Sequence, residues 1–420
     1  MEEFGSLEGY EKNRYWSIRL PRSNFLITGS NWLYRLFWKI LTLIMLIPLF
    51  LVAKYYAKRL KSNYEEDEGK DSIRPYRYFL EIYPGCVYSP FVKGYELELF
   101  KNRDMDPPIL EIGMGDGYLS SLIFKSKKTK LNYGSDLIYG TIKSAIKYDH
   151  CENHVVMDAV EIPFPDNFLG TVVMNNLMHH LHDRSVALRE VLRVLKNGGR
   201  FIFTDNTIGW GIFTWDQMLL RRLKLQRLAD FILNFKLKLF AQRLLTDNDY
   251  YDKKSAEGGY KINRKVNFVS KSTMCLSSLF EFLNLKTGQP TRKEMVVWMN
   301  LFGLRKNIDG YLDDIIKNCC AKDREQTLKE GYAFQFFEVE KMGTKGPEEK
   351  SGSRSIPYVC PKCKKDLANS NVNSFFCKYC NLEYPIVDGI PILLSYQNKL
   401  QEFKSYIKKK EREESEAFIT

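Results

Sequence analysis

The stretch 109–120, ILEIGMGDGYLS, decides the fold of this 420-residue chain. Three glycines, Gly113, Gly115 and Gly117, stand at alternate positions directly after a short apolar run. The run predicts a buried strand, and the residues after the glycines have helical spacing. Glycine lets the backbone turn tightly and lets a ligand lie against bare main chain beside a helix amino terminus. The stretch therefore predicts a strand, a ligand-binding glycine turn and a helix.

The segments that follow predict further strands in a fixed order. LNYGSDL is a second short strand ending at Asp136, HVVMDAVEIPFPDN is a third, and NFLGTVVMNNLMHHLHD is a fourth with its loop. LREVLRVLKNGGRFIFTDN predicts a helix, a turn and a fifth strand, and AFQFFEVEKM at 333–342 predicts the last strand. Alternation of strands with helices indicates an α/β fold with a mostly parallel sheet. An acid about 20 positions after a glycine turn is where dinucleotide folds bind a ribose.

The glycine spacing, G-x-G-x-G, differs from the G-x-G-x-x-G of dinucleotide folds. With Glu111 two residues before the first glycine, it resembles motif I of the class I S-adenosylmethionine (SAM)-dependent methyltransferases. The resemblance covers residues 76–342 and is closest over 109–205. It implies a Rossmann-like, seven-stranded α/β sheet and an enzyme that uses SAM. Residues 206–332 are longer than the family's usual path between its fifth and last strands, and they predict a helical insertion.

The resemblance also implies the cofactor contacts. The three glycines cradle SAM, Glu111 helps to hold the methionine amino group, and Asp136 takes the ribose hydroxyls. Asp158 and Ala159, after the third strand, contact the adenine edge. Asn175, at the end of the fourth strand, is a further contact in the pocket or a cap of the strand end. For the two aspartates, the alternative is a solvated acid in a turn.

The candidate bases are His179 and His180, in the loop after the fourth strand. Methyl transfer from a sulfonium is an in-line displacement that mainly requires alignment. An oxygen or nitrogen acceptor must also lose a proton, and histidine is the side chain that titrates nearest to neutral pH. Each histidine could instead pack the pocket wall, so the sequence leaves the catalytic residue open.

The amino-terminal segment 1–60 contains an apolar run, LFWKILTLIMLIPLFLVA, at 36–53. With its flanks the run reaches the roughly 20 residues that span a bilayer, which predicts a membrane-associated helix over about 36–56. Basic residues crowd its carboxyl side, so the positive-inside rule puts the catalytic domain in the cytoplasm. A buried core helix and a helix lying in the interface are the alternatives. Residues 61–75 are polar and charged and predict a linker.

The stretch 210–245, within the predicted insertion, alternates apolar and basic residues at helical spacing. It predicts a helix pair that covers the substrate pocket, a basic amphipathic surface on a membrane, or a face that binds RNA phosphates. The chain carries a net charge of +12. That charge is compatible with a membrane, a nucleic acid or an acidic substrate and selects none of them.

Four cysteines near the carboxyl terminus form two C-x2-C pairs with thirteen residues between them. They are Cys360, Cys363, Cys377 and Cys380. Pairs at this spacing bring four thiolates around Zn2+, and a closed four-cysteine site is structural. Redox-active pairs are the alternative. The segment 358–396 resembles the small zinc-ribbon proteins that partner tRNA, rRNA and translation-factor methyltransferases. Residues 343–357 predict a flexible linker before it, and 397–420 a charged tail after it.

Together these features predict a membrane-associated SAM-dependent methyltransferase with a fused zinc ribbon. Its acceptor is an oxygen or nitrogen on a lipid, a lipid-linked glycan or a small molecule. The alternative is a tRNA, rRNA or translation-protein methyltransferase whose fused ribbon acts as an activator. A SAM-binding scaffold without catalysis is a third interpretation, of a different class.

Overall fold

A computed structural model gives the fold of the chain. It describes residues 96, 99–100, 103–115, 117–125, 130–181, 183–239, 248–275, 323, 325–343, 357–371 and 373–396. The predicted membrane helix at 36–56, the linker 61–75 and the tail 397–420 lie outside these residues, as does most of the linker 343–357. No helix in the described part of the chain is long and apolar enough to cross a bilayer.

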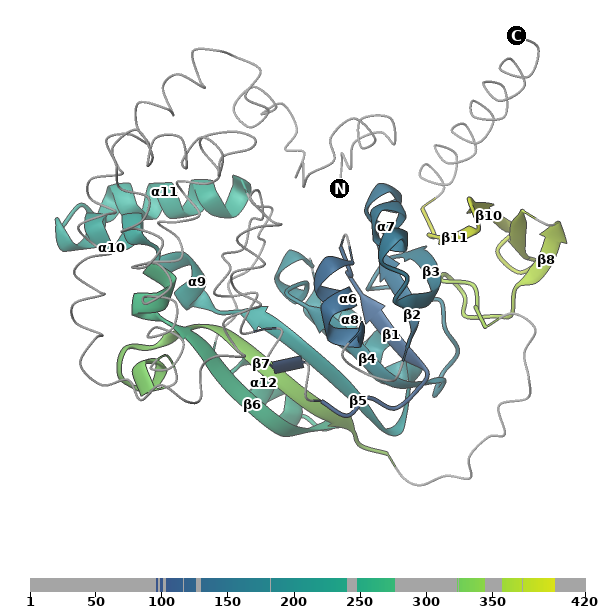
Figure 1. Cartoon of the computed structure of the whole chain (residues 1–420), viewed down its shortest axis with the longest axis horizontal. Coiled ribbons are helices and arrows are strands. Elements are labelled where there is room, and N and C mark those ends of the chain that lie inside the picture. Colours follow the sequence, from purple (N-terminus) through teal and green to yellow (C-terminus); the bar gives the residue numbers. More distant parts are fainter. Residues whose placement is uncertain are drawn as a thin grey trace, which may run out of the picture.

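The described strands form one sheet in the order β6-β7-β5-β4-β1-β2-β3-β11-β10-β9-β8 (Figure 1). Five of them run parallel in its centre. They are β1 (Ile109–Ile112), β2 (Leu131–Asp136), β3 (Cys151–Met157), β4 (Leu169–Asn175) and β5 (Leu195–Asn206). β7 (Tyr332–Lys341) lies antiparallel between β5 and β6 (Tyr260–Ser270). The Rossmann-like α/β prediction is confirmed over these seven strands, but the described sheet has eleven because four more join beside β3.

The structure corrects the predicted helical insertion at 206–332, because its described part also contains β6. β6 pairs with β7 along its whole length and forms an edge of the sheet. Its sequence, YKINRKVNFVS, alternates exposed and partly buried residues in its first half, as expected of an edge strand with one wet face. The helices of this segment are α9 (Ile208–Ile212), α10 (Trp215–Arg222), α11 (Gln226–Leu239) and α12 (Tyr250–Ala256).

Alternate side chains of the central strands enter two hydrophobic cores, one on each face of the sheet. Leu110 and Ile112 of β1 belong to one core, whereas Ile109 belongs to the other. α7 (Tyr139–Ala145) and α8 (Arg184–Val194) contribute to the first core, and α6 (Tyr118–Lys125) and α9 to the second. Burial on both faces explains why β1 and β4, at the centre of the sheet, are mostly apolar.

The four carboxyl-terminal strands extend the sheet rather than forming a detached module. They are β8 (Ala368–Asn371), β9 (Ser374–Cys377), β10 (Leu382–Val387) and β11 (Ile390–Leu393). β11 runs parallel to β3, with Ile392 opposite Val156. Tyr358 and Tyr384 belong to the same hydrophobic core as Leu110 and Ile112 of β1. The segment 358–396, called the ribbon below, is therefore continuous with the methyltransferase-like sheet.

Candidate functional site

The glycine turn between β1 and α6 has the backbone conformation that only glycine adopts easily. Gly113, Gly115 and Gly117 have φ values of +73°, +60° and +74°. The amides of Gly113 and Met114 donate to the Ser135 carbonyl at 2.8 and 2.9 Å. The turn is therefore fixed to the end of β2, and its backbone lies at the carboxyl ends of the parallel strands, where open α/β sheets bind ligands.

Other segments also pack closely against two of the glycines. A Cβ atom at Gly113 would lie 2.8 Å from Cδ2 of Leu177, in the loop after β4. A Cβ atom at Gly117 would lie 2.6 Å from Cβ of Ala145, at the end of α7. The turn thus brings the β4 loop and α7 against itself, which sequence spacing alone did not indicate.

Asp136 lies beside the turn, at the end of β2. Its Oδ2 accepts from the Gly115 amide at 3.1 Å and its Oδ1 from the Ile138 amide at 3.0 Å. Burial raises the pKa of Asp136 to about 6, and these backbone N–H groups oppose the rise. The structure therefore brings the predicted ribose acid to the predicted glycine cradle.

Glu111 is 3% exposed and points beneath the turn, toward α6. Its carboxylate accepts a short hydrogen bond from the Ser120 hydroxyl, and Nε2 of His150 lies 2.8 Å from the same hydroxyl. This buried cluster supports the start of α6 from below. The predicted contact between Glu111 and the methionine amino group stays a prediction.

Asp158 follows β3 and is held by two donors. The Val160 amide donates to Oδ1 at 3.1 Å, and the Tyr396 hydroxyl donates to Oδ2 at 2.8 Å. Burial and the Asp158 charge raise the pKa of Tyr396, so the phenol stays protonated and remains a donor. Tyr396 could not be predicted from a local motif, because it lies 238 residues from its partner. Ala159, the other predicted adenine contact, is buried beside Asp158.

Asn175 ends β4, on the same side of the sheet. Its Oδ1 accepts from the Thr204 hydroxyl of β5 at 2.8 Å. Its Nδ2 is buried and has no hydrogen-bond partner among the described residues. A buried donor without a partner at a strand end fits a ligand-contacting residue, and the Thr204 bond shows that Asn175 also ties β4 to β5.

A buried polar cluster surrounds His179, in the short 3-10 helix η2 (Met178–His180) after β4. Its Nδ1 lies 2.9 Å from Oδ1 of Asp205, on β5. The Tyr251 hydroxyl, from α12, donates to the other oxygen of Asp205 at 2.7 Å, and Nη1 of Arg184 lies 3.6 Å away. His179, Asp205 and Tyr251 are each at most 1% exposed.

The electrostatics of this cluster keep Asp205 charged. Burial alone would raise the pKa of Asp205, but the hydrogen bonds from His179 and Tyr251 and the charge of Arg184 hold it below its usual value. Nε2 of His179 is buried without a hydrogen-bond partner in the part of the chain described. His180 is partly exposed, and its ring centroid lies 4.2 Å from that of His179. Both histidines were predicted from the sequence, whereas Asp205, Arg184 and Tyr251 were not.

The four ribbon cysteines converge, with their sulfur atoms all within 4.8 Å of one another. Cys360 and Cys380 are 3.9 Å apart, and Cys363 and Cys377 are 3.5 Å apart, measured between sulfurs. Four sulfurs placed tetrahedrally at the usual Zn–S distance of about 2.3 Å would be about 3.8 Å apart. The donor set therefore fits a zinc ion.

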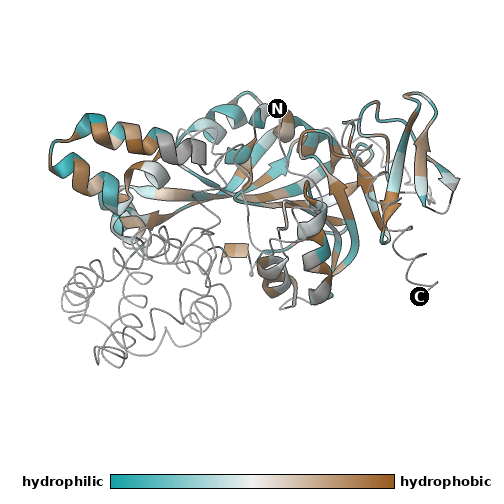
Figure 2. Ribbon diagram, turned by 90° about the horizontal axis from the view of Figure 1, so that it is seen from above, coloured by the Kyte–Doolittle hydropathy of each residue, from teal (hydrophilic) through white to brown (hydrophobic). Residues whose placement is uncertain are grey.

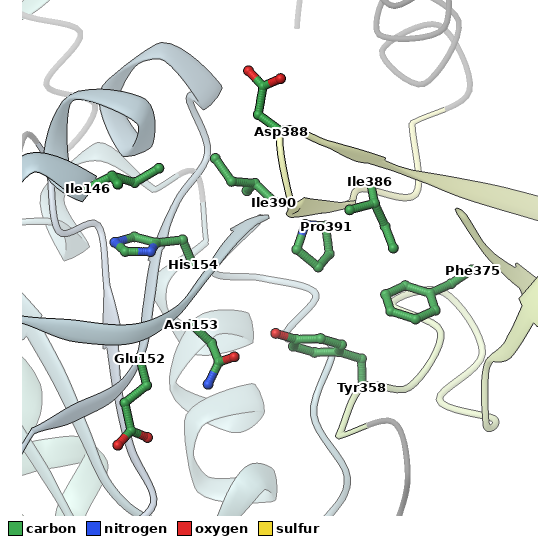
Figure 3. A pocket seen from close by; sticks show the side chains of 11 residues that line it. Ile146, Glu152, Asn153, His154, Tyr358, Phe375, Ile386, Asp388, Ile390 and Pro391 are labelled. Carbon is green, nitrogen blue, oxygen red and sulfur yellow. The ribbon is translucent and has the colours of Figure 1, made fainter. Parts of the chain in front are cut away.

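A cavity of about 330 Å³ opens between β3 and the ribbon (Figure 3). Its walls include Glu152 and His154 from the start of β3, and Tyr358 and Phe375 from the ribbon. Asp158 follows the other end of β3, roughly 15 Å from these β3 residues at about 3.3 Å per residue. The cavity is therefore a feature of the ribbon seam and lies apart from the glycine turn.

A sheet of this order, with a glycine turn and strand-end acids, defines an α/β enzyme that binds a nucleotide-type cofactor. Residues 110–203 match the family model of a methyltransferase domain. The chain is 30% identical over 203 residues to a fatty-acid O-methyltransferase of Mycolicibacterium smegmatis, covering 44% of this chain and 69% of that protein. The chain belongs to the class I SAM-dependent methyltransferases.

Further similarities cover smaller parts or are weaker. The chain is 32% identical over 101 residues to the ubiquinone/menaquinone biosynthesis C-methyltransferase UbiE of Desulfotalea psychrophila, covering 24% of this chain and 41% of that protein. A solved complex between the Trm112 methyltransferase activator of Haloferax volcanii and a methyltransferase matches with 12% identity. It covers 66% of this chain and 96% of that one, with a TM-score of 0.38.

Proposed function

We propose that this methyltransferase transfers the methyl group of SAM to an oxygen or nitrogen of a lipid-type acceptor at a membrane surface. The observation that carries the proposal is the buried Asp205–His179 pair beside the ends of β4 and β5, because it supplies a base for an acceptor that must lose a proton. Similarity to a fatty-acid O-methyltransferase supports the lipid class. A lipid-linked glycan or a small molecule presented at the membrane would use the same groups.

One group of residues would bind the cofactor, and another would act on the acceptor. The glycine turn and Asp136 would hold SAM, which supplies an activated methyl group. Asp205 accepts a hydrogen bond from Nδ1 of His179, which leaves the buried Nε2 as the nitrogen that would take the acceptor proton. A hydroxyl or amine acceptor requires this step, whereas an ionised carboxylate has no proton to lose. Dependence on His179 therefore reports the chemistry of the acceptor.

Membrane association is proposed from the apolar segment at 36–56, and the basic residues after it support a catalytic domain that faces the cytoplasm. We also propose that Cys360, Cys363, Cys377 and Cys380 bind a structural Zn2+ as thiolates. A closed set of four protein ligands leaves no position for a reacting group. The ion would stabilise the small ribbon, whose own core is limited.

The second candidate function is methylation of tRNA, rRNA or a translation protein, with the ribbon as a fused activator. The observation in its favour is that the ribbon reaches the cofactor side, through β11 on β3 and Tyr396 on Asp158. Lipid is placed first because the alignment with the fatty-acid O-methyltransferase covers 69% of that protein.

One labelling experiment separates these functions. Full-length protein is incubated with tritiated-methyl SAM and a cell extract, which is then divided into lipid, RNA, protein and small-molecule fractions. We expect label in the lipid fraction, lost in Asp136→Asn and retained in the matched control Asp104→Asn, whose side chain is 95% exposed. Mild alkali then releases volatile label from a methyl ester and leaves a methyl ether or N-methyl product intact. Label confined to RNA or protein would overturn the lipid assignment.

A further inference from the structure

The hairpin formed by α10 and α11 carries a dense cluster of exposed apolar side chains. Among the described residues, ten large hydrophobic residues are exposed, and five of them fall within residues 219–231. They are Leu219, Leu223, Leu225, Leu228 and Phe231. Phe231 is 69% exposed, and Leu223 is 58% exposed. Exposed apolar residues concentrated in this way mark an interaction surface.

The same surface is positively charged. Residues 222–229 contain Arg222, Lys224 and Arg227, all exposed, and no acid. The next acid, Asp230, lies 2.9 Å from Arg221 and so offsets that arginine rather than these three. We call residues 219–231 the hairpin tip. Leucine and basic side chains alternate along it.

Two hydrogen bonds hold the hairpin in shape. Gln217 of α10 is fully buried, and its Nε2 donates to the Ala229 carbonyl of α11 at 2.8 Å. The Leu225 amide donates to the Leu220 carbonyl at 2.9 Å, which closes the turn between the helices. The apolar side chains of the tip are thus presented by a fixed element that projects from the body of the molecule (Figure 2).

The hairpin starts from the catalytic end of the sheet. α9 begins at Ile208, two residues after β5 ends at Asn206, and α10 follows it directly. Asp205, which contacts His179, is the last residue but one of β5. α9 has five residues and α10 has eight, which rise about 8 and 12 Å at 1.5 Å per residue. The tip is therefore joined to the strand ends, where the acceptor would react, through two short helices.

We propose that the hairpin tip docks on an anionic lipid bilayer. Leu223, Leu225 and Phe231 enter the interface, and the neighbouring arginine and lysine side chains bind lipid phosphates. The charge pattern selects a negative surface, and the leucines select one with an apolar layer beneath it. An RNA partner would engage the basic side chains but leave the leucines in water. This inference rests on the proposed lipid acceptor, which docking would bring to the strand ends.

Amide hydrogen exchange of the full-length protein tests the docking residue by residue. Exchange is followed alone, with phosphatidylcholine vesicles, and with vesicles containing about one-third phosphatidylglycerol. We expect the anionic vesicles to slow exchange roughly tenfold within 219–231 and the neutral vesicles to slow it less. The double variant Leu223→Asp/Leu225→Asp should lose this protection. The matched control Leu328→Asp, at a residue that is 87% exposed outside the hairpin, should keep it.

The local readout separates the tip from the amino-terminal apolar segment, which is unchanged in both variants. Unprotected tip amides in vesicle-bound protein would overturn the docking and leave the lipid acceptor standing. Protection by a 30-nucleotide RNA but not by vesicles, or protection that rises with protein concentration alone, would also overturn it. Lipid labelling should fall in the double variant toward vesicle-embedded acceptor and stay unchanged toward a detergent-solubilised one. Absence of label from the lipid fraction of the unchanged protein would instead contradict the proposed function.

Discussion

The two ends of the sheet are built differently (Figure 1). At one end the ribbon pairs with β3 through β11. Its last described residue, Tyr396, donates a hydrogen bond to Asp158, a predicted cofactor contact. At the other end, beyond β5, the α10–α11 hairpin leaves leucines exposed. The end with the ribbon is held by strand pairing and a side-chain hydrogen bond, whereas the other end carries exposed apolar side chains. The first arrangement fixes a site, and the second offers a surface to a partner.

The largest expected effect concerns the glycine turn. Gly117→Ala places a Cβ atom 2.6 Å from Ala145 at a positive φ, so we expect unfolding to become easier by about 2–5 kcal/mol, from left-handed strain and overpacking together. Gly198→Ala is the matched control, because Gly198 has φ +77° with nothing within 4 Å of the added atom. It should lose only the roughly 1–2 kcal/mol of backbone strain. Thermal and urea unfolding measure both, and equal losses would show that the contact with α7 does not matter.

The next effect tests the acceptor side. His179→Gln should lower kcat about 100-fold for a hydroxyl or amine acceptor, because general-base catalysis is lost, and leave SAM affinity unchanged. The measurement is steady-state kinetics with the labelled fraction, beside calorimetry for SAM. His154→Gln, at the ribbon seam, is the control and should keep full activity. A loss of SAM affinity in His179→Gln would place this histidine on the cofactor side instead.

A tenfold effect is expected from pH at the cofactor side. Burial raises the pKa of Asp136 to about 6, and only the ionised carboxylate can accept both ribose hydroxyls. About a tenth of the carboxylates are ionised at pH 5, so SAM should bind about tenfold more weakly there than at pH 7.5. The contribution of Asp136 to stability has the opposite sign. Its folded pKa lies above its unfolded value, so the unliganded protein gains stability as pH falls through about 6.

Calorimetric titration of SAM across this range provides the measurement. Asp136→Asn should bind SAM weakly at every pH and show no step near pH 6. A step of unchanged size in that variant would assign the titration to another group.

The smallest effect measures how far the ribbon supports the cofactor side. Tyr396→Phe removes a donor to a carboxylate, an interaction worth about 1.5–3 kcal/mol, and part of that loss should reach SAM. We expect a roughly threefold to tenfold weaker SAM affinity. Tyr379→Phe, at a ribbon residue that is 63% exposed, should have no effect. Equal affinities in both variants would separate the ribbon from cofactor binding.

The parts that could be predicted from the sequence are those specified by local chemistry. The turn could be predicted from Gly113, Gly115 and Gly117, because a positive φ excludes most other residues. Asp136 and the two C-x2-C pairs follow from fixed spacing. Strands β1 and β4 follow from their apolar residues, and β2, β3 and β5 follow from the order of segments after the glycine turn.

The parts that escaped prediction depend on contacts between distant segments. Asp205, Arg184 and Tyr251 come from β5, α8 and α12, and none of them stands in a motif. Strand β6 was hidden because its alternating polar residues resemble a surface segment. The pairing of β11 with β3 has no local signal, because two short apolar strands give no indication of which edge they will join.

The parallel pairing of the ribbon with β3 also means that the two paired strands are synthesised at different times. Tyr396 follows its partner Asp158 by 238 residues, so the central strands leave the ribosome long before the strand that covers their edge. At a translation rate of about 5–20 residues per second, the edge of β3 that β11 later joins stays unpaired for roughly 10 to 50 seconds. An open strand edge is a site for wrong pairing. The nascent chain therefore has a defined period in which a chaperone or a neighbouring strand can occupy the place that β11 finally takes.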